Sequence, residues 1–188
     1  MLNHVSLFSG YEGFGLGLKL AGMPLRTVLY CESEPYAQEI LRARVRDNLL
    51  QDAPIWPDVR TLNGRILAGK VDVITAGFPC QPFSVAGLQR REDDVRNMWP
   101  DTIRVIREMG EGLEWILLEN TPGLFHRTKG REPYFSTVVS DLSLAGFHLQ
   151  FKVVSAHDVS APHLRKRLWI VAHANNERCE EQCGASTV

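Results

Sequence analysis

The chain has 188 residues, of which 44% are hydrophobic and 23% are charged, and its net charge is −1. These proportions exclude a disordered or fibrous protein and fit one globular domain with a sizeable core. The net charge excludes a generally basic surface, so any site for a polyanion must be local. Sixteen of the 21 basic residues are arginine, the side chain that suits bidentate contacts to phosphates and bases.

Neither a secretory signal nor an apolar segment long enough for a membrane span is found, so we expect no membrane association. The four cysteines follow no disulfide framework, which favours the reducing cytoplasm. Cys179 and Cys183 lie near His173 but lack a clear fourth ligand. We therefore expect no metal site.

Short apolar runs alternate with segments of helical periodicity. The runs predict strands at 5–8, 27–31, 71–76, 115–118, 148–155 and 168–172. Helices are expected at 13–21, 36–46, 98–109 and 134–144. This alternation indicates an α/β fold with a doubly wound, mostly parallel sheet. Only residues 156–167 join the last two strands, without a helical pattern, which favours an antiparallel pair. We expect one domain, 1–174, and an irregular tail, 175–188.

A glycine-rich turn follows the first predicted strand and opens a helix. Gly10 and Gly13 let the backbone approach a ligand, and the helix N-terminus attracts an anionic group. Glu32 ends the second strand, where an acid commonly binds ribose hydroxyls. The spacing differs from G-x-G-x-x-G, and Glu12 would set negative charge against a pyrophosphate. A ligand with a ribose, a carboxylate and a positive centre fits better, which points to S-adenosylmethionine.

A cysteine follows the third predicted strand on a turn bracketed by Pro79 and Pro82. The prolines fix φ and remove two backbone donors, so the turn is stiff and aims the Cys80 side chain. A cysteine beside an apolar strand is usually buried and inert. The acid and amide at 119–120 and the basic cluster at 165–167 favour a nucleophile instead, because these strand ends can converge.

Taken in order, these motifs resemble those of the cytosine-5 DNA methyltransferase family, over roughly residues 5–172. Residues 8–14 resemble the family's first cofactor motif, and Glu32 resembles its second. Asp58 stands where the family contacts the adenine of its cofactor. The resemblance implies a Rossmann-like fold that binds S-adenosylmethionine.

The catalytic motifs of the family have counterparts as well. Residues 77–84, Gly-Phe-Pro-Cys-Gln-Pro-Phe-Ser, are nearly its consensus nucleophile loop. Residues 119–121 resemble its Glu-Asn-Val motif, and residues 161–167 resemble its later Pro, Gln, Arg-x-Arg motif. The nucleophile loop is the most specific of these matches.

The resemblance implies a role for each matching residue. Cys80 would attack cytosine C6, making C5 able to accept a methyl group. Glu119 would hold N3, with Asn120 supporting the site; Arg167 would bind O2, and Arg165 would order Glu119, the thiolate or a phosphate. The residues expected to contact the cofactor are Phe8, Gly10, Gly13, Glu32, Asp58, Phe78, Pro79 and Trp99. The alternative for Trp99 is a position in the hydrophobic core. The cytosine must leave the double-stranded DNA. The residues expected to contact DNA are Gln81, Ser84, Arg90, Arg91 and Arg96.

Four positions depart from the family pattern. Ser6 stands in place of a frequent acid, and Glu12 in place of a glycine. Ser33 stands where a tryptophan often covers the adenine, and His163 replaces a glutamine. None of these changes removes the proposed nucleophile, the glutamate or the arginines.

Family members also carry a target-recognition domain and two further motifs after the last motif matched here. We expect either the catalytic half of a two-chain enzyme, completed by a second polypeptide, or a catalytically incomplete remnant that binds the cofactor or a partner. A third hypothesis is methylation of RNA cytosine. Residues 76–80 follow the prokaryotic DNA-enzyme form of the loop, which favours DNA and a prokaryotic or phage restriction-modification enzyme in the cytoplasm, associated with the nucleoid.

Overall fold

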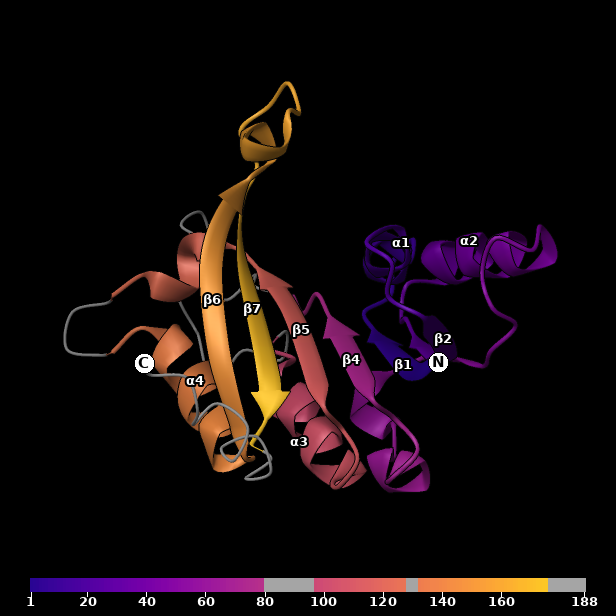
Figure 1. Ribbon diagram of the computed structural model, residues 1–188, viewed down its shortest axis with the longest axis horizontal. Helices are drawn as coiled ribbons and strands as arrows, with labels where there is room; N and C mark the ends of the chain where they lie inside the picture. The colour runs from indigo at the N-terminus through magenta and orange to yellow at the C-terminus, as the bar shows by residue number, and fades with distance from the viewer. Residues whose placement is uncertain (80–96, 128–131, 176–188) are drawn as a thin grey trace, which may run out of the picture.

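The apolar runs form one seven-stranded sheet in the computed structural model, which describes residues 1–79, 97–127 and 132–175 (Figure 1). The order of strands across the sheet is β3-β2-β1-β4-β5-β7-β6. The strands are β1 (Leu2–Leu7), β2 (Leu25–Cys31), β3 (Ile55–Trp56), β4 (Val73–Ala76), β5 (Trp115–Asn120), β6 (Phe147–Ser155) and β7 (Lys166–Ala174). The two-residue β3 was not predicted, because it is too short to show an alternating pattern.

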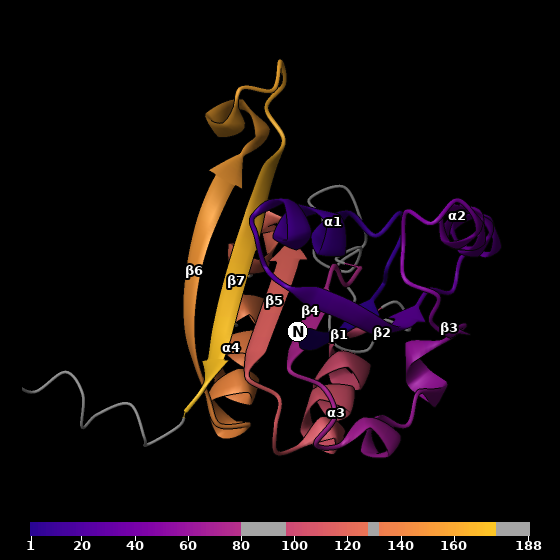
Figure 2. The ribbon, with the colours of Figure 1, turned by 45° about the vertical axis from the view of Figure 1, so that its right-hand side comes forward.

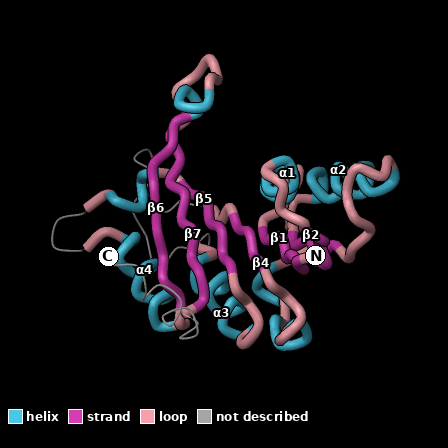
Figure 3. Tube along the Cα trace, viewed as in Figure 1, coloured by secondary structure: helices cyan, strands magenta, loops and turns pink. Residues whose placement is uncertain are grey.

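Strands β1 to β5 pair in parallel, whereas β7 is antiparallel to both β5 and β6. The predicted antiparallel last pair is therefore confirmed. The β6–β7 hairpin extends beyond the rest of the sheet, and the short helical turn η6 (Ala156–Val159) lies at its tip (Figure 3). Because β7 returns between β6 and β5, its first residues lie beside the carboxyl end of β5.

Four α-helices pack on the sheet within the described residues: α1 (Gly13–Leu20), α2 (Pro35–Arg46), α3 (Trp99–Met109) and α4 (Tyr134–Leu144). All four lie close to their predicted positions. Pro35 occupies the first turn of α2, where its missing N–H has no helical partner to lose. Helix α1 lies on the face of the sheet opposite α3 and α4 (Figure 2). None of the helices described is long and apolar enough to cross a membrane.

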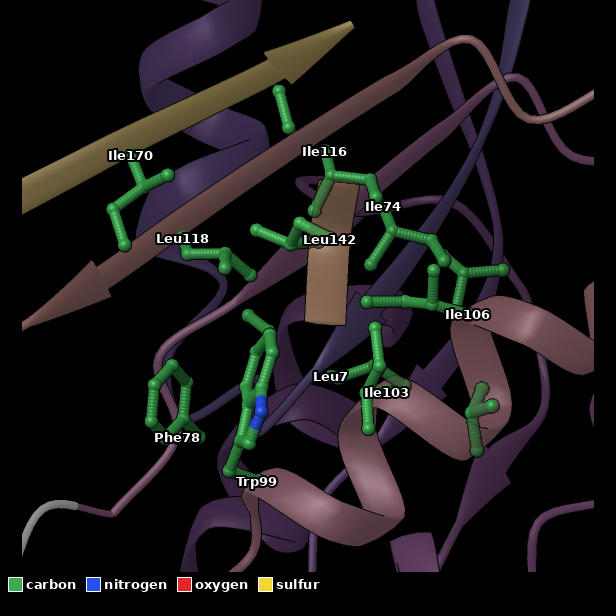
Figure 4. Packing of buried hydrophobic residues seen from close by; sticks show 14 of the residues in the cluster. Leu7, Ile74, Phe78, Trp99, Ile103, Ile106, Ile116, Leu118, Leu142 and Ile170 are labelled. Carbon is green, nitrogen blue, oxygen red and sulfur yellow. The ribbon is translucent and has the colours of Figure 1, made fainter. Parts of the chain in front are cut away.

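The main core lies between the sheet and α3 and α4. Successive strand residues point to opposite faces, so Leu7, Ile74 and Ile116 face the helices together. They pack against buried side chains of both helices, among them Ile106 and Leu142 (Figure 4). Burial of each such side chain contributes roughly 1.5–3 kcal/mol. This packing holds the ends of β4 and β5, which carry the motifs identified in the sequence.

Candidate functional site

The glycine turn, residues 8–12, connects β1 to α1 and is held by the acid that ends β2. The Gly10 amide donates to Glu32 Oε2 at 2.7 Å, and the Glu34 amide donates to Glu32 Oε1 at 2.8 Å. Gly10 has a φ of 52°, in the left-handed region that glycine adopts without strain. Gly10 and Glu32, each expected to contact the cofactor, are thus in direct contact with each other.

A pocket of about 210 Å³ opens beside this turn. We call it the strand-end pocket; it is lined by Phe8, Cys31, Ser33, Asp58, Val59, Arg60, Pro79 and Met98. It lies at the carboxyl ends of β1, β2 and β4, where doubly wound sheets bind ligands. Of the residues expected to contact the cofactor, Phe8, Asp58 and Pro79 line it.

Asp58 is bound to a residue that sequence reasoning missed. Arg60 Nε donates to Asp58 Oδ1 and Oδ2 at 3.0 Å each, and Arg60 Nη2 donates to Oδ2 at 2.7 Å. These hydrogen bonds lower the pKa of the Asp58 carboxyl. The spacing of two residues between Asp58 and Arg60 was the signal in the sequence that could have indicated this ion pair.

Cys31 also lines the strand-end pocket, and it was not selected from the sequence. Burial, followed by the nearby Glu32 and Asp58 carboxylates, raises the pKa of its thiol to about 12. The thiol is therefore neutral at physiological pH and suits an apolar pocket wall.

Trp99 and Phe78 pack in the core, and neither side chain lines the strand-end pocket. Trp99 is 1% exposed, its ring centre lies 5.2 Å from that of Phe78, and its Nε1 donates to Asp141 Oδ2 at 2.9 Å. The core alternative for Trp99 is the one observed (Figure 4). Met98, one residue earlier, lines the pocket instead, because the start of α3 turns Trp99 inward.

A larger pocket, of about 660 Å³, lies between α1 and the β6–β7 hairpin. We call it the hairpin pocket; it is lined by Gly13, Phe14, Glu119, Val154, Ser155, Ala156, Val159, Arg165, Arg167 and Trp169. Three residues selected from separate motifs, Glu119, Arg165 and Arg167, therefore meet here. Gly13, expected at the cofactor, lines this pocket.

Glu119 forms an ion pair with Arg167 in the hairpin pocket. Glu119 Oε1 lies 2.6 Å from Arg167 Nε, and each side chain is only about a fifth exposed. The antiparallel register sets Glu119 opposite Trp169, two residues from Arg167 on the same face of β7. We had expected Arg165 as one partner for Glu119, but Arg167 makes this contact.

The hairpin pocket has an aromatic wall that the motifs did not reveal. The rings of Phe14 and Trp169 meet edge to face with centres 5.5 Å apart. Trp169 shares a face of β7 with Arg167, so the period of two along a strand was the signal that could have found it.

Residues 77–79 run between the two pockets. A Cβ atom on Gly77 would lie 3.6 Å from Glu119 Oε2, so a side chain at position 77 would contact that carboxylate. Asn120 is buried, and its Nδ2 donates to the carbonyl oxygen of Phe78 at 3.1 Å. Asn120 therefore ties the chain just before Cys80 to the end of β5.

Six of the predicted site residues lie outside the described ranges. They are Cys80, Gln81, Ser84, Arg90, Arg91 and Arg96. Pro79, which directly precedes Cys80, is described and lines the strand-end pocket.

The sequence model of the C-5 cytosine-specific DNA methylase family matches residues 2–187. This chain belongs to that family. It is 36% identical over 170 residues to the type II methyltransferase M.PspPI of Psychrobacter sp., covering 89% of this chain and 38% of that relative. It is 33% identical over 175 residues to M1.HphI of Haemophilus parahaemolyticus, covering 89% and 44%. The chain thus spans about half the length of the curated relatives it matches.

Solved structures of methyltransferases share the fold. The Dnmt2 methyltransferase of S. pombe superimposes with a TM-score of 0.74 at 23% identity, covering 94% of this chain and 52% of that one. A Spodoptera frugiperda DNMT2 mutant gives 0.75 at 22% identity, covering 94% and 51%. The expected Rossmann-like methyltransferase fold is confirmed.

One sequence argument about this methylase-family chain does not hold. Glu12 was expected to set negative charge against a ligand at the turn, but it is 1% exposed. Burial raises the pKa of its carboxyl, which disfavours the charged form. The side chain points into the protein, where its Oε1 lies 3.7 Å from His4 Nδ1, and its backbone is left-handed with a φ of 61°.

Proposed function

We propose that residues 1–174 form the catalytic domain of a DNA cytosine-5 methyltransferase. It would transfer a methyl group from S-adenosylmethionine to C5 of a cytosine flipped out of double-stranded DNA. The observation that carries this proposal is the meeting of Glu119 with Arg167 in the hairpin pocket, next to the backbone that leads to Cys80. Membership of the methylase family supports it.

The strand-end pocket fits S-adenosylmethionine. Phe8, Met98 and Val59 offer apolar contacts to an adenine, while Glu32 and Asp58 supply carboxylates near it for amino and hydroxyl groups. S-adenosylmethionine supplies an electrophilic methyl group on a positively charged sulfur. Ser33 lines the pocket at the position where family members often have tryptophan, so this chain holds the adenine without that ring.

In the proposed mechanism, the Cys80 thiolate bonds to cytosine C6 and C5 becomes nucleophilic. Glu119 holds the ring at N3. Its Oε1 is bound by Arg167, which supports Oε2 as the oxygen that contacts N3. Arg167 keeps further N–H groups for cytosine O2. Once C5 carries the methyl group, loss of the C5 proton to water and breaking of the Cys80–C6 bond complete the cycle.

The hairpin pocket suits a flipped base. Its volume of about 660 Å³ exceeds what one pyrimidine needs, and Phe14 and Trp169 in its lining offer apolar surface for a base. Arg165 also lines this pocket, where it can contact a flanking phosphate or the thiolate. We propose that DNA reaches this side of the sheet, that a second polypeptide reads the target sequence, and that the enzyme works in the cytoplasm beside the nucleoid.

The decisive test is covalent trapping on duplex DNA that contains 5-fluorocytosine, which blocks the final loss of the C5 substituent. The full chain is incubated with S-adenosylmethionine and this DNA, with and without a complementary recognition polypeptide. We expect a stable adduct with the wild type and none with Cys80→Ser. Absence of any adduct on DNA would overturn the proposal.

Two further arms separate the alternatives. Calorimetric binding of S-adenosylmethionine without an adduct on any nucleic acid would identify a cofactor-binding remnant. An adduct with 5-fluorocytosine RNA but not with DNA would select the RNA hypothesis.

A further inference from the structure

A buried polar cluster lies under α1, outside both pockets. It consists of His4 and Ser6 of β1, Thr27 of β2, Thr75 of β4 and Glu12 of the glycine turn, and none is more than 3% exposed. Strand register brings four of them together, because His4 is paired with Thr27 and Ser6 with Thr75. None of these residues has a role in the proposed methyl transfer.

His4 is fixed from both sides of its ring. Its Nδ1 lies 3.1 Å from Thr27 Oγ1, and its Nε2 lies 2.9 Å from Thr75 Oγ1. Glu12 Oε1 lies 3.7 Å from the same Nδ1. The ring is therefore a rigid neighbour for the Glu12 carboxyl. Burial, with a smaller effect of Lys19, lowers the pKa of His4 to about 4.

Glu12 occupies its position at two energetic costs. Its backbone is left-handed, with φ 61° and ψ 42°, where glycine is favoured. Its carboxyl is buried, and within the described residues neither oxygen has a hydrogen bond of normal geometry. The Ser6 hydroxyl and the Gly15 amide are close enough to oppose the burial that raises its pKa. A glycine at position 12, as in the family pattern, would avoid both costs.

The surroundings are shaped to receive this carboxyl. A Cβ atom on Gly15 would lie 2.2 Å from Glu12 Oε1, so the carboxyl fills space that any side chain at position 15 would need. The Ser6 hydroxyl is beside the carboxyl. By the resemblance noted in the sequence, position 6 is where a frequent acid is expected. The two departures at Ser6 and Glu12 are thus neighbours in space: the acid missing from the strand is supplied by the turn.

We propose that Glu12 is a positioning residue whose carboxyl, supplied from the turn in place of an acid at Ser6, fixes the glycine turn against β1. The turn is then held at both ends, by Glu12 in the cluster and by Glu32 on the Gly10 amide. Its effect on the cofactor rests on the proposed function of the strand-end pocket. Glu12 acts through the position of the turn and touches no reacting atom.

The test exchanges the acid between the two positions. A role limited to backbone strain predicts that Glu12→Gly binds S-adenosylmethionine as well as the wild type, because glycine suits a φ of 61°. The positioning role predicts about tenfold weaker binding by calorimetry for Glu12→Gly. It also predicts recovery to within about threefold in the Ser6→Asp/Glu12→Gly double variant. Unchanged binding in Glu12→Gly, or no recovery in the double variant, would overturn the proposal.

Two controls accompany the exchange. Asn48 is an exposed residue with a φ of 57°, so Asn48→Gly relieves the same backbone strain far from the turn and should leave binding unchanged. Glu12→Gln keeps the shape of the side chain without its charge, and we expect it to bind within about threefold of the wild type. A loss in Glu12→Gln as large as in Glu12→Gly would contradict positioning by a neutral carboxyl.

A measurement without cofactor separates this proposal from the proposed function. If the wild type binds no S-adenosylmethionine, the assignment of the strand-end pocket fails, but hydrogen exchange of the Gly10 amide still reports the turn. Protection of that amide, which donates to Glu32, should fall about tenfold in Glu12→Gly and return in the double variant. Equal protection in all three proteins would refute the role of Glu12.

Discussion

At the scale of single residues, one arginine-carboxylate pair dominates the hairpin pocket. Arg167 contacts Glu119 through Nε, and its planar guanidinium keeps further N–H groups that can donate hydrogen bonds to a pyrimidine oxygen. A lysine has a single charged nitrogen and no such fork. The geometry of the pair therefore matters as much as its charge.

We expect Arg167→Ala to reduce methyl transfer at least about 100-fold, because it removes both the partner of Glu119 and the donor to the base. Arg167→Lys should recover only a small part of this loss. Initial rates with labelled S-adenosylmethionine measure both. Arg127→Ala is a matched control, because Arg127 pairs with Glu132 at an exposed site, with 72% and 70% of the two side chains accessible. Equal losses in the Arg127 and Arg167 variants would argue against a specific role.

The buried His4 should make stability depend on pH. Its pKa is lowered from 6.5 to about 4 by burial, so between these values the unfolded chain binds a proton that the folded chain does not. The contribution of neutral His4 to the free energy of unfolding is complete above pH 6.5. It falls as the pH drops from 6.5 to about 4, by about 3 kcal/mol in total.

The measurement is urea unfolding at pH 7 and pH 4.5 for wild type and His4→Gln. Glu12, which lies 3.7 Å from the ring, and Lys19, whose charge acts on it, are present in both proteins. The difference between the pH dependence of the wild type and that of the variant therefore isolates His4. We expect the wild type to lose more stability than the variant on acidification. Parallel slopes would show that His4 does not titrate as its burial implies.

At the scale of elements, α3 connects the core to the site. Its first residue, Trp99, packs on Phe78, and the residue before it, Met98, lines the strand-end pocket. Asn120 binds the Phe78 carbonyl from the end of β5. The segment leading to Cys80 is therefore held by a helix on one side and by a strand on the other.

We expect Ile106→Ala in α3 to lower the free energy of unfolding by about 2–5 kcal/mol, because Ile106 is 1% exposed and a cavity would remain. Ile66→Ala is the control, since Ile66 is 54% exposed and should change stability by less than about 1 kcal/mol. Chemical denaturation measures both. Similar values for the two variants would contradict the packing described.

At the scale of the whole molecule, the sheet gathers both pockets along the carboxyl ends of its central strands. The chain spans about half the length of its curated relatives. The net charge of −1 offers little general attraction to DNA.

We therefore expect residues 1–188 to bind duplex DNA weakly and with little preference between sequences. Fluorescence anisotropy with several duplexes at two salt concentrations measures this, and affinity should fall as salt rises. Tight, sequence-selective binding by residues 1–188 would contradict this expectation.

Apart from the two-residue β3, the order of elements, the mostly parallel sheet with its antiparallel end, and the family could be predicted from the sequence. These follow from apolar periodicity and from motifs such as residues 77–84, which are local along the chain. It also selected Glu119, Arg165 and Arg167 without showing which of them touch.

Which of the selected side chains touch one another became clear from the fold. The insertion of β7 between β5 and β6 chose Arg167 as the partner of Glu119, and the turn of α3 sent Trp99 into the core and Met98 to the pocket. The left-handed backbone at Glu12 turned its carboxyl beneath α1 beside Ser6, where two separate departures from the family pattern meet. Strand order and side-chain direction depend on packing between distant segments, and no pattern of neighbouring residues encodes them directly.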